Sequence, residues 1–453
     1  MFKSYLYGEG DSNHSPLRRK HFENQSRETQ EWLIDDQENF FQQSLSTPCL
    51  DVVEEAKGPF LTMIDGKVVY DFHGNAVHQV GFGHPRIIEA MKEQLDTLSF
   101  STRRYTNKPA IRLGKKLAEL APGSLSKCLF APGATSAIGM ALKLARFTTG
   151  KYKTISMWES FHGASMDALS VGGEAHFRRQ IGPLLPGAIH VPPIQTYRPL
   201  WEGASLDDRQ LANYIEYIVK QDGEVGAFVM EPIRNTDVQM PSKAFMKQLR
   251  AICTEHNIKL IFDETAIGLG RTGQMFAFEH YGIEPDMVVL GKGLGGGAFP
   301  MAALLADQAL DQVEETSLGH YTHEKSPVGA TAALTTIEVI EEEGLLERSR
   351  QLECMVRDRL ETMKESYSVI GDVRGVGLLF GIELVKDRDT KEKAREEADR
   401  IMHTCLQNGL SFKVSKGNVL QLCPPLTITE DQLTEALDIL EQALLESENG
   451  KES

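Results

Sequence analysis

The sequence predicts an α/β fold, with a large domain built on an open, mostly parallel sheet and a second, smaller α/β domain. Between residues 110 and 305, short apolar runs alternate with helical stretches. The runs are continuous and do not alternate with polar residues, which indicates strands buried on both faces of a parallel sheet covered by helices. The length of 453 residues is enough for two or three domains, since one domain takes roughly 100 to 200 residues.

The first expected elements precede the large sheet. Residues 1–55 are mostly polar and are expected to form an arm with helices within 15–45. Asp65-Gly66 separates two short runs, 60–64 and 67–72, which predicts a hairpin. Helical periodicity covers 86–97, and we assign 56–98 to the small domain. The strands expected within the large, cofactor-binding domain, 99–326, are 128–130, 154–157, 227–230, 259–262 and 287–290.

Residues 327–453 are expected to complete the small domain. A helix at 328–340 leads into three glutamates, which we interpret as a solvated helix end. Two strands, 377–385 and 410–414, alternate with helices at 392–407 and 430–446, and the last residues form a polar tail.

Composition argues against several classes of function. Lys and Arg total 48 against 64 Asp and Glu, a formal net charge of −16, so the chain lacks the basic field that nucleic acids or anionic membranes require. No stretch approaches the ~20 apolar residues of a membrane span, and the N-terminus lacks a signal-peptide core, so we expect a cytoplasmic location. The six cysteines have neither disulfide nor metal-ligand spacing, so we expect reduced thiols and no metal site.

The residues that follow each strand are the candidates for a site, because ligands of open α/β sheets bind beyond the carboxyl ends of the strands. The first run is followed by Ala-Pro-Gly-Ala-Thr-Ser, which opens a helix. Backbone N–H groups there could cradle a phosphate at Gly133, Ala134 and Thr135, although these residues also suit a plain N-cap. Phe161 and His162 follow the second run, where the alternative is a core aromatic beside a buried histidine.

Acidic residues follow the third and fourth runs, and a lysine follows the fifth. Glu231 and Asp263 could be surface caps, but like charges that converge in one cleft require a cation. Lys292, among the glycines of 291–297, supplies one. These glycines also match G-x-G-x-x-G, yet that motif must open a helix in a first βαβ unit, whereas Ala-Phe-Pro and another apolar run, 301–305, follow here. We therefore set the dinucleotide interpretation aside.

A lysine held by glycines at the mouth of a sheet suits covalent chemistry, because its amine can form a Schiff base with an aldehyde. If the aldehyde is pyridoxal 5'-phosphate (PLP), the other residues take roles. Asp263 would pair with the pyridine nitrogen and keep it protonated, Phe161 would stack on the ring, and residues 133–135 would hold the phosphate.

Motifs along most of the chain resemble those of the class III, or ornithine-type, aminotransferase family of PLP enzymes. The matching segments are Gly66, 70–72 (Tyr-Asp-Phe), 83–85 (Gly-His-Pro), 141–146 (Ala-Leu-Lys-Leu-Ala-Arg), 161–163 (Phe-His-Gly), 231–232 (Glu-Pro), 263–264 (Asp-Glu), 270–273 (Gly-Arg-Thr-Gly), 292–297 (Lys-Gly-Leu-Gly-Gly-Gly) and 424–426 (Pro-Pro-Leu). The resemblance implies the fold-type I PLP-dependent transferase fold, with a mostly parallel seven-stranded sheet. It also implies PLP as cofactor and a homodimer with active sites at the interface.

The resemblance also implies roles for individual residues. It implies Lys292 as the Schiff-base lysine and Asp263 at the ring nitrogen, with His162 and Glu231 also beside the cofactor. Thr322 matches the threonine that reaches the cofactor phosphate of the neighbouring subunit.

The departures from the family pattern concern the reaction. Family aminotransferases usually place an arginine before Pro-Pro-Leu to grip a substrate carboxylate, and that position is Gln421 here. A neutral amide cannot replace a bidentate guanidinium contact at similar strength. Residues 132–136 lack an acid that the family usually has, Ala266 replaces a glutamine, and 323–326 (His-Glu-Lys-Ser) replace Phe-Gly-Gly-Asn. The chain keeps the cofactor apparatus without the carboxylate clamp.

A lyase needs one substrate and no acceptor site. Within the family, the pattern is most similar to ammonia-lyases of (R)-1-hydroxy-2-aminoethylphosphonate, which implies proton removal by Lys292 and β-elimination of the hydroxyl, giving phosphonoacetaldehyde and ammonia. An amine substrate that bears a phosphonate or phosphate needs cations, and each candidate also has a plain interpretation as a surface or structural cation. The candidates are Arg103, Arg104, Arg234 and Lys325.

Two alternatives stay open. One is an ω-aminotransferase that transfers an amino group to a 2-oxo acid gripped elsewhere. The other is a cofactor-binding protein without catalysis, although a mere scaffold has no use for both Lys292 and Asp263.

Overall fold

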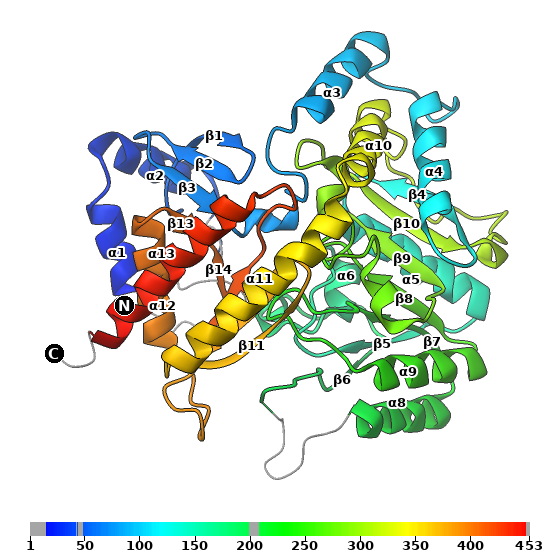
Figure 1. The fold of residues 1–453 in the computed structure, drawn as a ribbon. Helices are drawn as coiled ribbons and strands as arrows, with labels where there is room; N and C mark the ends of the chain where they lie inside the picture. The colour runs from blue at the N-terminus through cyan, green and yellow to red at the C-terminus, as the bar shows by residue number, and fades with distance from the viewer. Residues whose placement is uncertain (1–14, 42, 44–48, 199–207, 450–453) are drawn as a thin grey trace.

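A seven-stranded sheet forms the centre of the larger part of the molecule in the structure, a computed structural model that describes residues 15–41, 43, 49–198 and 208–449 (Figure 1). The strand order is β4-β10-β9-β8-β7-β5-β6, in which β10 is antiparallel to both neighbours and the other pairs are parallel. The expected fold class is thereby confirmed. The strands are β4 (Leu125–Ala131), β5 (Lys153–Met157), β6 (Ala188–Val191), β7 (Val225–Met230), β8 (Lys259–Asp263), β9 (Met287–Leu290) and β10 (Ala302–Asp307).

All five strands predicted for the large domain are present, and two more complete the sheet. The apolar run 301–305, for which the sequence analysis predicts no strand, forms most of β10. The edge strand β6 is not predicted either, because it has four residues of which three are only half-buried. A short edge strand carries too little hydrophobic signal to be found from sequence.

Both faces of the sheet are buried, which accounts for the continuous apolar runs. In β7, Phe228 and Val229 belong to different hydrophobic clusters, one on each face. Helix α5 (Ala134–Thr149) supplies one cluster, while α8 (Asp208–Asp222) and α9 (Lys243–Glu255) supply the other. Strands covered on both sides have no solvent face, so most of them lack the polar alternation of a half-exposed strand. Strand β5 is an exception, because it carries the buried polar residues Thr154 and Ser156.

The smaller part of the molecule holds two four-stranded sheets, β1-β2-β3-β13 and β11-β12-β15-β14. The second sheet is antiparallel throughout. The strands of the first sheet are β1 (Val53–Lys57), β2 (Phe60–Met63), β3 (Val68–Asp71) and β13 (Leu410–Ser411). The strands of the second are β11 (Ile370–Val376), β12 (Leu379–Leu384), β14 (Lys413–Ser415) and β15 (Val419–Leu422).

Helices surround these sheets and join them to the central one (Figure 1). The expected helices at 86–97, 328–340, 392–407 and 430–446 correspond to α3, α10, α12 and α13. The remaining bounds are α1 (Pro16–Glu23), α2 (Arg27–Asn39), α3 (Pro85–Thr97), α4 (Lys108–Leu120), α6 (Met166–Val171), α7 (Ala175–Arg178), α10 (Pro327–Glu342), α11 (Leu345–Ser366), α12 (Arg395–Gln407) and α13 (Glu430–Asn449).

Several details near the two ends agree with the sequence analysis. Helices α1 and α2 lie within the arm expected to be helical, and α1 packs against α12. The hairpin expected around Asp65-Gly66 is formed by β2 and β3. The three glutamates at 341–343 are exposed at the end of α10. The domain boundaries after residues 55, 98 and 326 stay predictions.

Several elements of the C-terminal part differ from expectation. The predicted strand 410–414 is two strands in two sheets, because β13 pairs with β3 while β14 pairs with β15. Long α11 is not predicted, since its apolar stripe is narrow and its other positions are largely charged. Strands β11 and β15 are also absent from the prediction. The pairing of β13 depends on β3, which lies far away in the chain.

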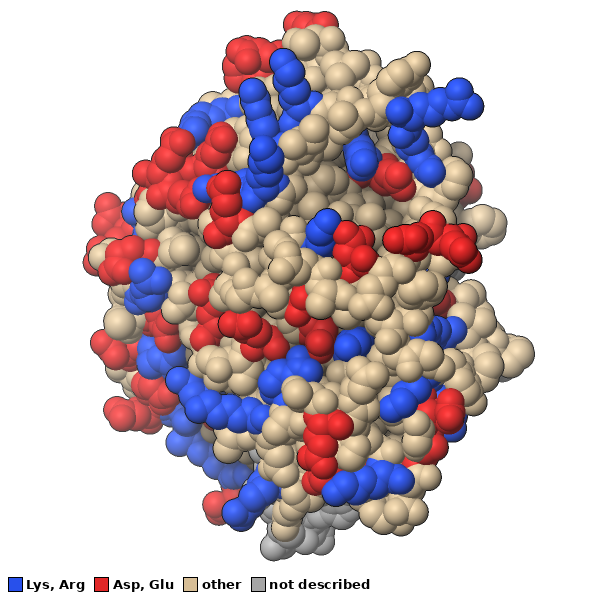
Figure 2. Space-filling view, turned by 90° about the vertical axis from the view of Figure 1, so that its right-hand side faces the viewer, with Lys and Arg blue, Asp and Glu red and all other residues tan. Residues whose placement is uncertain are grey.

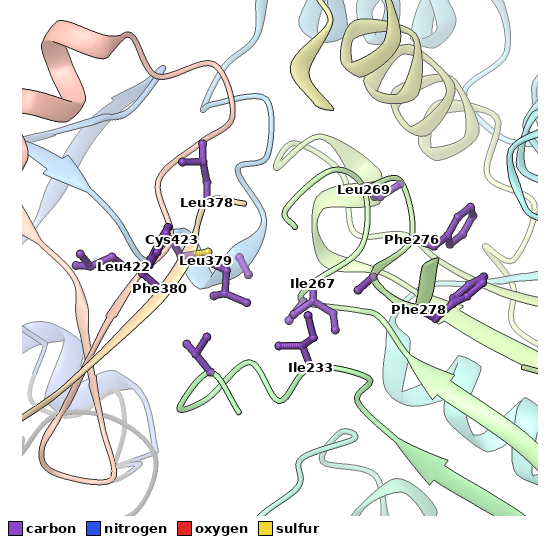
Figure 3. Packing of buried hydrophobic residues seen from close by; sticks show 14 of the residues in the cluster. Ile233, Ile267, Leu269, Phe276, Phe278, Leu378, Leu379, Phe380, Leu422 and Cys423 are labelled. Carbon is purple, nitrogen blue, oxygen red and sulfur yellow. The ribbon is translucent and has the colours of Figure 1, made fainter. Parts of the chain in front are cut away.

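Hydrophobic packing joins the smaller part to the central sheet. Figure 3 shows Leu379 and Phe380 of β12 across from Ile233 and Ile267, which follow β7 and β8. All four side chains belong to one buried cluster. Among the described residues, no helix is long and apolar enough to cross a membrane.

Candidate active site

A cavity of about 530 Å³ opens at the carboxyl ends of the parallel strands. The strands place its wall residues because Asp263 ends β8, Glu231 follows β7, and Lys292 lies two residues after β9. Parallel pairing brings these ends to one edge of the sheet. The predicted residues that line the cavity are Gly133, Ala134, Thr135, Phe161, His162, Glu231, Asp263 and Lys292.

Asp263 is buried in this wall and held by several donors. His162 Nδ1 lies 2.9 Å from Asp263 Oδ2, and the Thr265 N–H and hydroxyl donate to Oδ1 at 3.1 and 2.5 Å. Burial opposes ionisation of Asp263, but these hydrogen bonds outweigh it and hold the pKa of the carboxyl below its ordinary value. Asp263 is therefore a fixed negative charge at neutral pH.

His162 lines the same cavity, and one of its two ring nitrogens does not contact Asp263. Its side chain is fully buried, and its Nε2 has no hydrogen-bond partner among the described residues. Buried polar atoms are normally paired in folded proteins. A polar group bound in the cavity would supply that partner.

Glu231 is the second carboxylate of the cavity. Its Oε1 accepts the backbone N–H of Asn235 at 3.1 Å. Burial raises the pKa of Glu231 to about 7, with the charge of Asp263 acting in the same direction and His162 against it. The two acids of the site therefore differ in charge near neutral pH.

Lys292 opens the short η3 turn (Lys292–Gly295) with φ of 45°, in the left-handed region that a lysine rarely adopts. Its side chain is exposed and lines the cavity. The turn is packed so closely that a Cβ on Gly293 would lie 1.8 Å from Gln79 Oε1. Such strained backbone persists where surrounding packing imposes it, as it commonly does at functional sites.

The start of α5 forms the opposite side of the cavity. Gly133 is the N-cap residue of α5 and, as a glycine, has no side chain that could cap the helix. The hydroxyls of Thr135 and Ser165 lie 2.7 Å apart, and a Cβ on Gly163 would come within 2.4 Å of Thr135 Oγ1. A crowded helix start with free N–H groups is a suitable cradle for a phosphate.

Other predicted residues lie away from this cavity. Thr322, Arg103, Arg104 and Lys325 are exposed and do not line it, and Arg103 pairs with Glu324 at 3.3 Å. The structure does not bring these residues to the site within one chain.

Arg234 is also outside the cavity, although it lies next to cavity residue Asn235. Its guanidinium makes two hydrogen bonds of 2.6 Å to Asp237 and lies 3.1 Å from Glu159. The side chain is buried among these carboxylates. Its plain interpretation, a structural cation, is the one that this geometry favours.

The sequence analysis misses part of the wall. Asn235, Thr236 and Thr265 line the cavity, as do Phe299 and Met301. A signal for the first three exists, since each lies within six residues of a strand end that carries a predicted site residue. The polar segment Arg-Asn-Thr directly after Glu-Pro-Ile could be noted on that ground.

Gln421, the expected departure from the family, does not line the cavity. It is buried in β15, and its Nε2 donates to the backbone oxygen of Asn235 at 2.6 Å and to Asn235 Oδ1 at 3.0 Å. Its effect on the site is therefore exerted through Asn235.

The sequence was compared with known protein families, and a family model described as Aminotransferase class-III matches residues 41–444. The chain belongs to the class-III aminotransferase family. It is 48% identical to a Vibrio splendidus protein named (R)-1-hydroxy-2-aminoethylphosphonate ammonia-lyase, with 97% of this chain and 95% of that protein covered. It is 33% identical to an alanine/serine racemase of Pyrococcus horikoshii, with 87% and 85% covered.

A solved structure supports the same fold. A Bacillus anthracis aminotransferase matches with a TM-score of 0.85 at 29% identity, covering 93% of this chain and 99% of that one. Class-III aminotransferases use PLP. The cavity fits that cofactor, because it combines a lysine amine, an ionised buried carboxylate, an unpartnered histidine nitrogen and a crowded helix start.

Proposed function

We propose that this class-III protein is a PLP-dependent carbon–nitrogen lyase that converts (R)-1-hydroxy-2-aminoethylphosphonate to phosphonoacetaldehyde and ammonia. The likeness to the Vibrio splendidus ammonia-lyase over nearly the whole of both chains supports the substrate. The observation that carries the reaction type is Gln421, which occupies the position where family aminotransferases usually have an arginine and which hydrogen-bonds to neutral Asn235. Loss of a guanidinium clamp weakens binding of the 2-oxo acid that transamination requires.

The cavity residues have separate roles in the proposed reaction. PLP, when bound, supplies an electron sink for charge at the carbon that bears the amine. In this proposal Asp263, which is ionised, would pair with the pyridine nitrogen, Phe161 would pack on the ring, and residues 133–135 would bind the phosphate; all of them line the cavity. Lys292 Nζ binds the cofactor and takes the proton from the amino-bearing carbon.

The atoms of the reaction balance without an oxidant or a second substrate. The amino-bearing carbon loses a proton to Lys292, and the hydroxyl leaves the neighbouring carbon as water. Addition of one water then separates the nitrogen as ammonia and leaves phosphonoacetaldehyde. Phosphonate catabolism in the cytoplasm is the setting that this reaction implies.

The proposed enzyme is a homodimer with its active sites at the interface. Thr322 would then reach the cofactor phosphate of the neighbouring subunit, which agrees with its exposed position outside this chain's cavity. Arg103, Arg104 and Lys325 remain candidate cations for the substrate anion, because they too are exposed outside this chain's cavity.

Ammonia release without an oxo acid tests the function. Purified enzyme loaded with PLP should release many equivalents of ammonia per site from the hydroxy-aminophosphonate. Lys292→Ala should abolish both turnover and the visible absorbance of the bound cofactor, whereas Lys220→Ala, at an exposed pair with Glu216 on α8, should change neither. Release that stops at one equivalent and is renewed by pyruvate or 2-oxoglutarate would instead identify an aminotransferase.

A further inference from the structure

The orientation of one amide in the cavity wall is determined by a second amide outside it. Gln421 Nε2 lies 2.6 Å from the backbone oxygen of Asn235. A backbone carbonyl can only accept, so Gln421 must present its N–H₂ group there. The same nitrogen lies 3.0 Å from Asn235 Oδ1, so Asn235 must turn its oxygen toward Gln421. Its Nδ2 group, with two donors, is then on the opposite side of the amide.

The side-chain N–H donors of Asn235 are available to a molecule bound in the cavity. Asn235 lines the cavity, and across the described parts of the chain its Nδ2 has no hydrogen-bond partner. Its backbone N–H is already given to Glu231 at 3.1 Å, and its two oxygens are both bonded to Gln421. The side-chain N–H₂ is therefore the part of Asn235 that a bound molecule can engage.

The loop that carries Asn235 is closed by backbone hydrogen bonds and packs against β11 and β12. Backbone hydrogen bonds of 2.9 and 3.3 Å join Arg234 and Gln239, and Arg374 Nε donates to the Asp237 carbonyl at 2.9 Å. Gly381, the strand partner of Gln421, approaches so closely that a Cβ there would lie 3.1 Å from Val238 Cβ. A loop that is closed by its own backbone hydrogen bonds and packed against a sheet keeps its side chains in one place, as a binding group requires.

We propose that Asn235 is a substrate-binding residue that donates from Nδ2 to an acceptor oxygen of the substrate, and that Gln421 is its positioning residue. This inference rests on the function proposed above and names a group that selects its substrate. A neutral donor pair does not neutralise a carboxylate as a guanidinium does, but it distinguishes substrates by whether an acceptor oxygen lies in reach. The hydroxyl and the phosphonate of the substrate both offer such oxygens.

Two probes distinguish these oxygens. The hydroxy-aminophosphonate carries both, whereas 2-aminoethylphosphonate lacks the hydroxyl and its binding can be followed by the change in cofactor absorbance. Asn235→Ala should weaken binding about 10- to 100-fold, the range expected for loss of a hydrogen bond to a polar or charged oxygen. Weakening of both probes assigns the phosphonate, and weakening of the hydroxylated substrate alone assigns the hydroxyl.

Further variants separate the side chain's chemistry from the stability of the loop. Asn235→Asp keeps an oxygen for Gln421 but replaces the two donors by a carboxylate, so it should bind phosphonates more weakly than Asn235→Ala. Gln421→Glu cannot donate to the two oxygens of Asn235, so the amide should turn and present its oxygen to the cavity. The double variant Gln421→Glu with Asn235→Ala should bind no more weakly than Asn235→Ala alone, because both changes remove one interaction.

A matched control exists on the surface. Gln248 Nε2 donates to Asn213 Oδ1 at 2.7 Å between α9 and α8, so Asn213→Ala breaks an amide pair of the same kind and should leave both probes unaffected. Thermal unfolding and cofactor absorbance report whether each variant is folded and loaded.

Unchanged binding of both probes by Asn235→Ala would overturn the assignment of Asn235. Additive losses in the double variant would overturn the positioning role of Gln421. If the wild type binds 2-aminoethylphosphonate but releases no ammonia from the hydroxylated substrate, the proposed lyase function fails while the binding arm still decides the role of Asn235. If the wild type binds neither probe, both conclusions fall.

Discussion

At the scale of single residues, environment separates two carboxylates that share one cavity. Burial disfavours the ionised form of both, yet the hydrogen bonds from His162 and Thr265 keep the pKa of Asp263 low. Glu231 accepts the Asn235 N–H, and burial still raises its pKa to about 7. Acids whose pKa values are pushed apart in this way can hold different charges at one pH.

The raised pKa of Glu231 has a consequence for stability. Its ordinary value is 4.5, so between about pH 4.5 and pH 7 the folded chain binds more protons than the unfolded chain. The free energy of unfolding therefore falls as pH rises through that window. Glu231→Gln cannot ionise, so its stability relative to the wild type should be higher at pH 8 than at pH 5 by about 1 to 3 kcal/mol.

Urea unfolding of the unloaded protein at the two pH values measures this difference. The same substitution at exposed Glu315 serves as the control and should leave the difference near zero. A Glu231→Gln variant that gains as much at pH 5 as at pH 8 would show that its effect is unrelated to ionisation.

At the scale of elements, the turn that carries Lys292 is shaped by its neighbours. Gly296 has φ of 66°, and a Cβ there would lie 2.6 Å from Thr336 Oγ1 of α10 and 2.7 Å from Ile87 Cδ1 of α3. Helix α10 also packs directly on the η3 turn. The position of Lys292 is therefore set by two helices outside the central sheet.

Two glycines of similar backbone angle separate strain from crowding. Gly223, in the turn between α8 and β7, has φ of 72°, and a Cβ there would have no atom within 4 Å, so Gly223→Ala should cost about 1 kcal/mol of stability from backbone strain alone. Gly296→Ala adds a clash and should cost about 1 to 3 kcal/mol more. It should also shift the cofactor absorbance, because Lys292 must move.

Thermal or urea unfolding of both variants, with absorbance spectra of the loaded protein, checks this expectation. Equal losses of stability and unchanged spectra in both would mean that α3 and α10 do not position the turn.

At the scale of the whole molecule, the formal net charge is −16. Over the face drawn in Figure 2, basic and acidic side chains are interspersed. A groove of about 430 Å³ lies beside the edge strand β4 and is lined in part by Leu129, Met140 and Leu318. Thr322 lies in the chain between Gly319 and Glu324, which also line it.

This groove is where we expect the second subunit. The native protein should sediment at twice the mass of one chain, and Leu129→Asp should shift it toward the monomer, because a charge would be buried without a partner. Leu445→Asp is the matched control, since Leu129 and Leu445 are 38% and 42% exposed and Leu445 lies on α13. A Leu129→Asp protein that remains a dimer would place the interface elsewhere.

The sequence predicts the large domain better than the small one for a physical reason. Strands β7, β8 and β9 are buried on both faces, so each shows as a largely continuous apolar run. The short strands β13 and β14 offer two or three residues each, and their separation into two sheets depends on β3 and β15. Local pattern cannot report the partner of β13, because β3 lies hundreds of residues before it in the chain.

The chemistry at the strand ends was determined by sequence alone, because parallel strands deliver their carboxyl ends to one edge. Lys292, Asp263 and Glu231 could be gathered on that basis, together with the start of α5. Tertiary structure decided what these groups meet. It committed Arg234 to Asp237 and Glu159, and it joined Gln421 to Asn235 across 186 positions of the chain. Charge pairing and amide orientation depend on such distant contacts, which residue order does not encode locally.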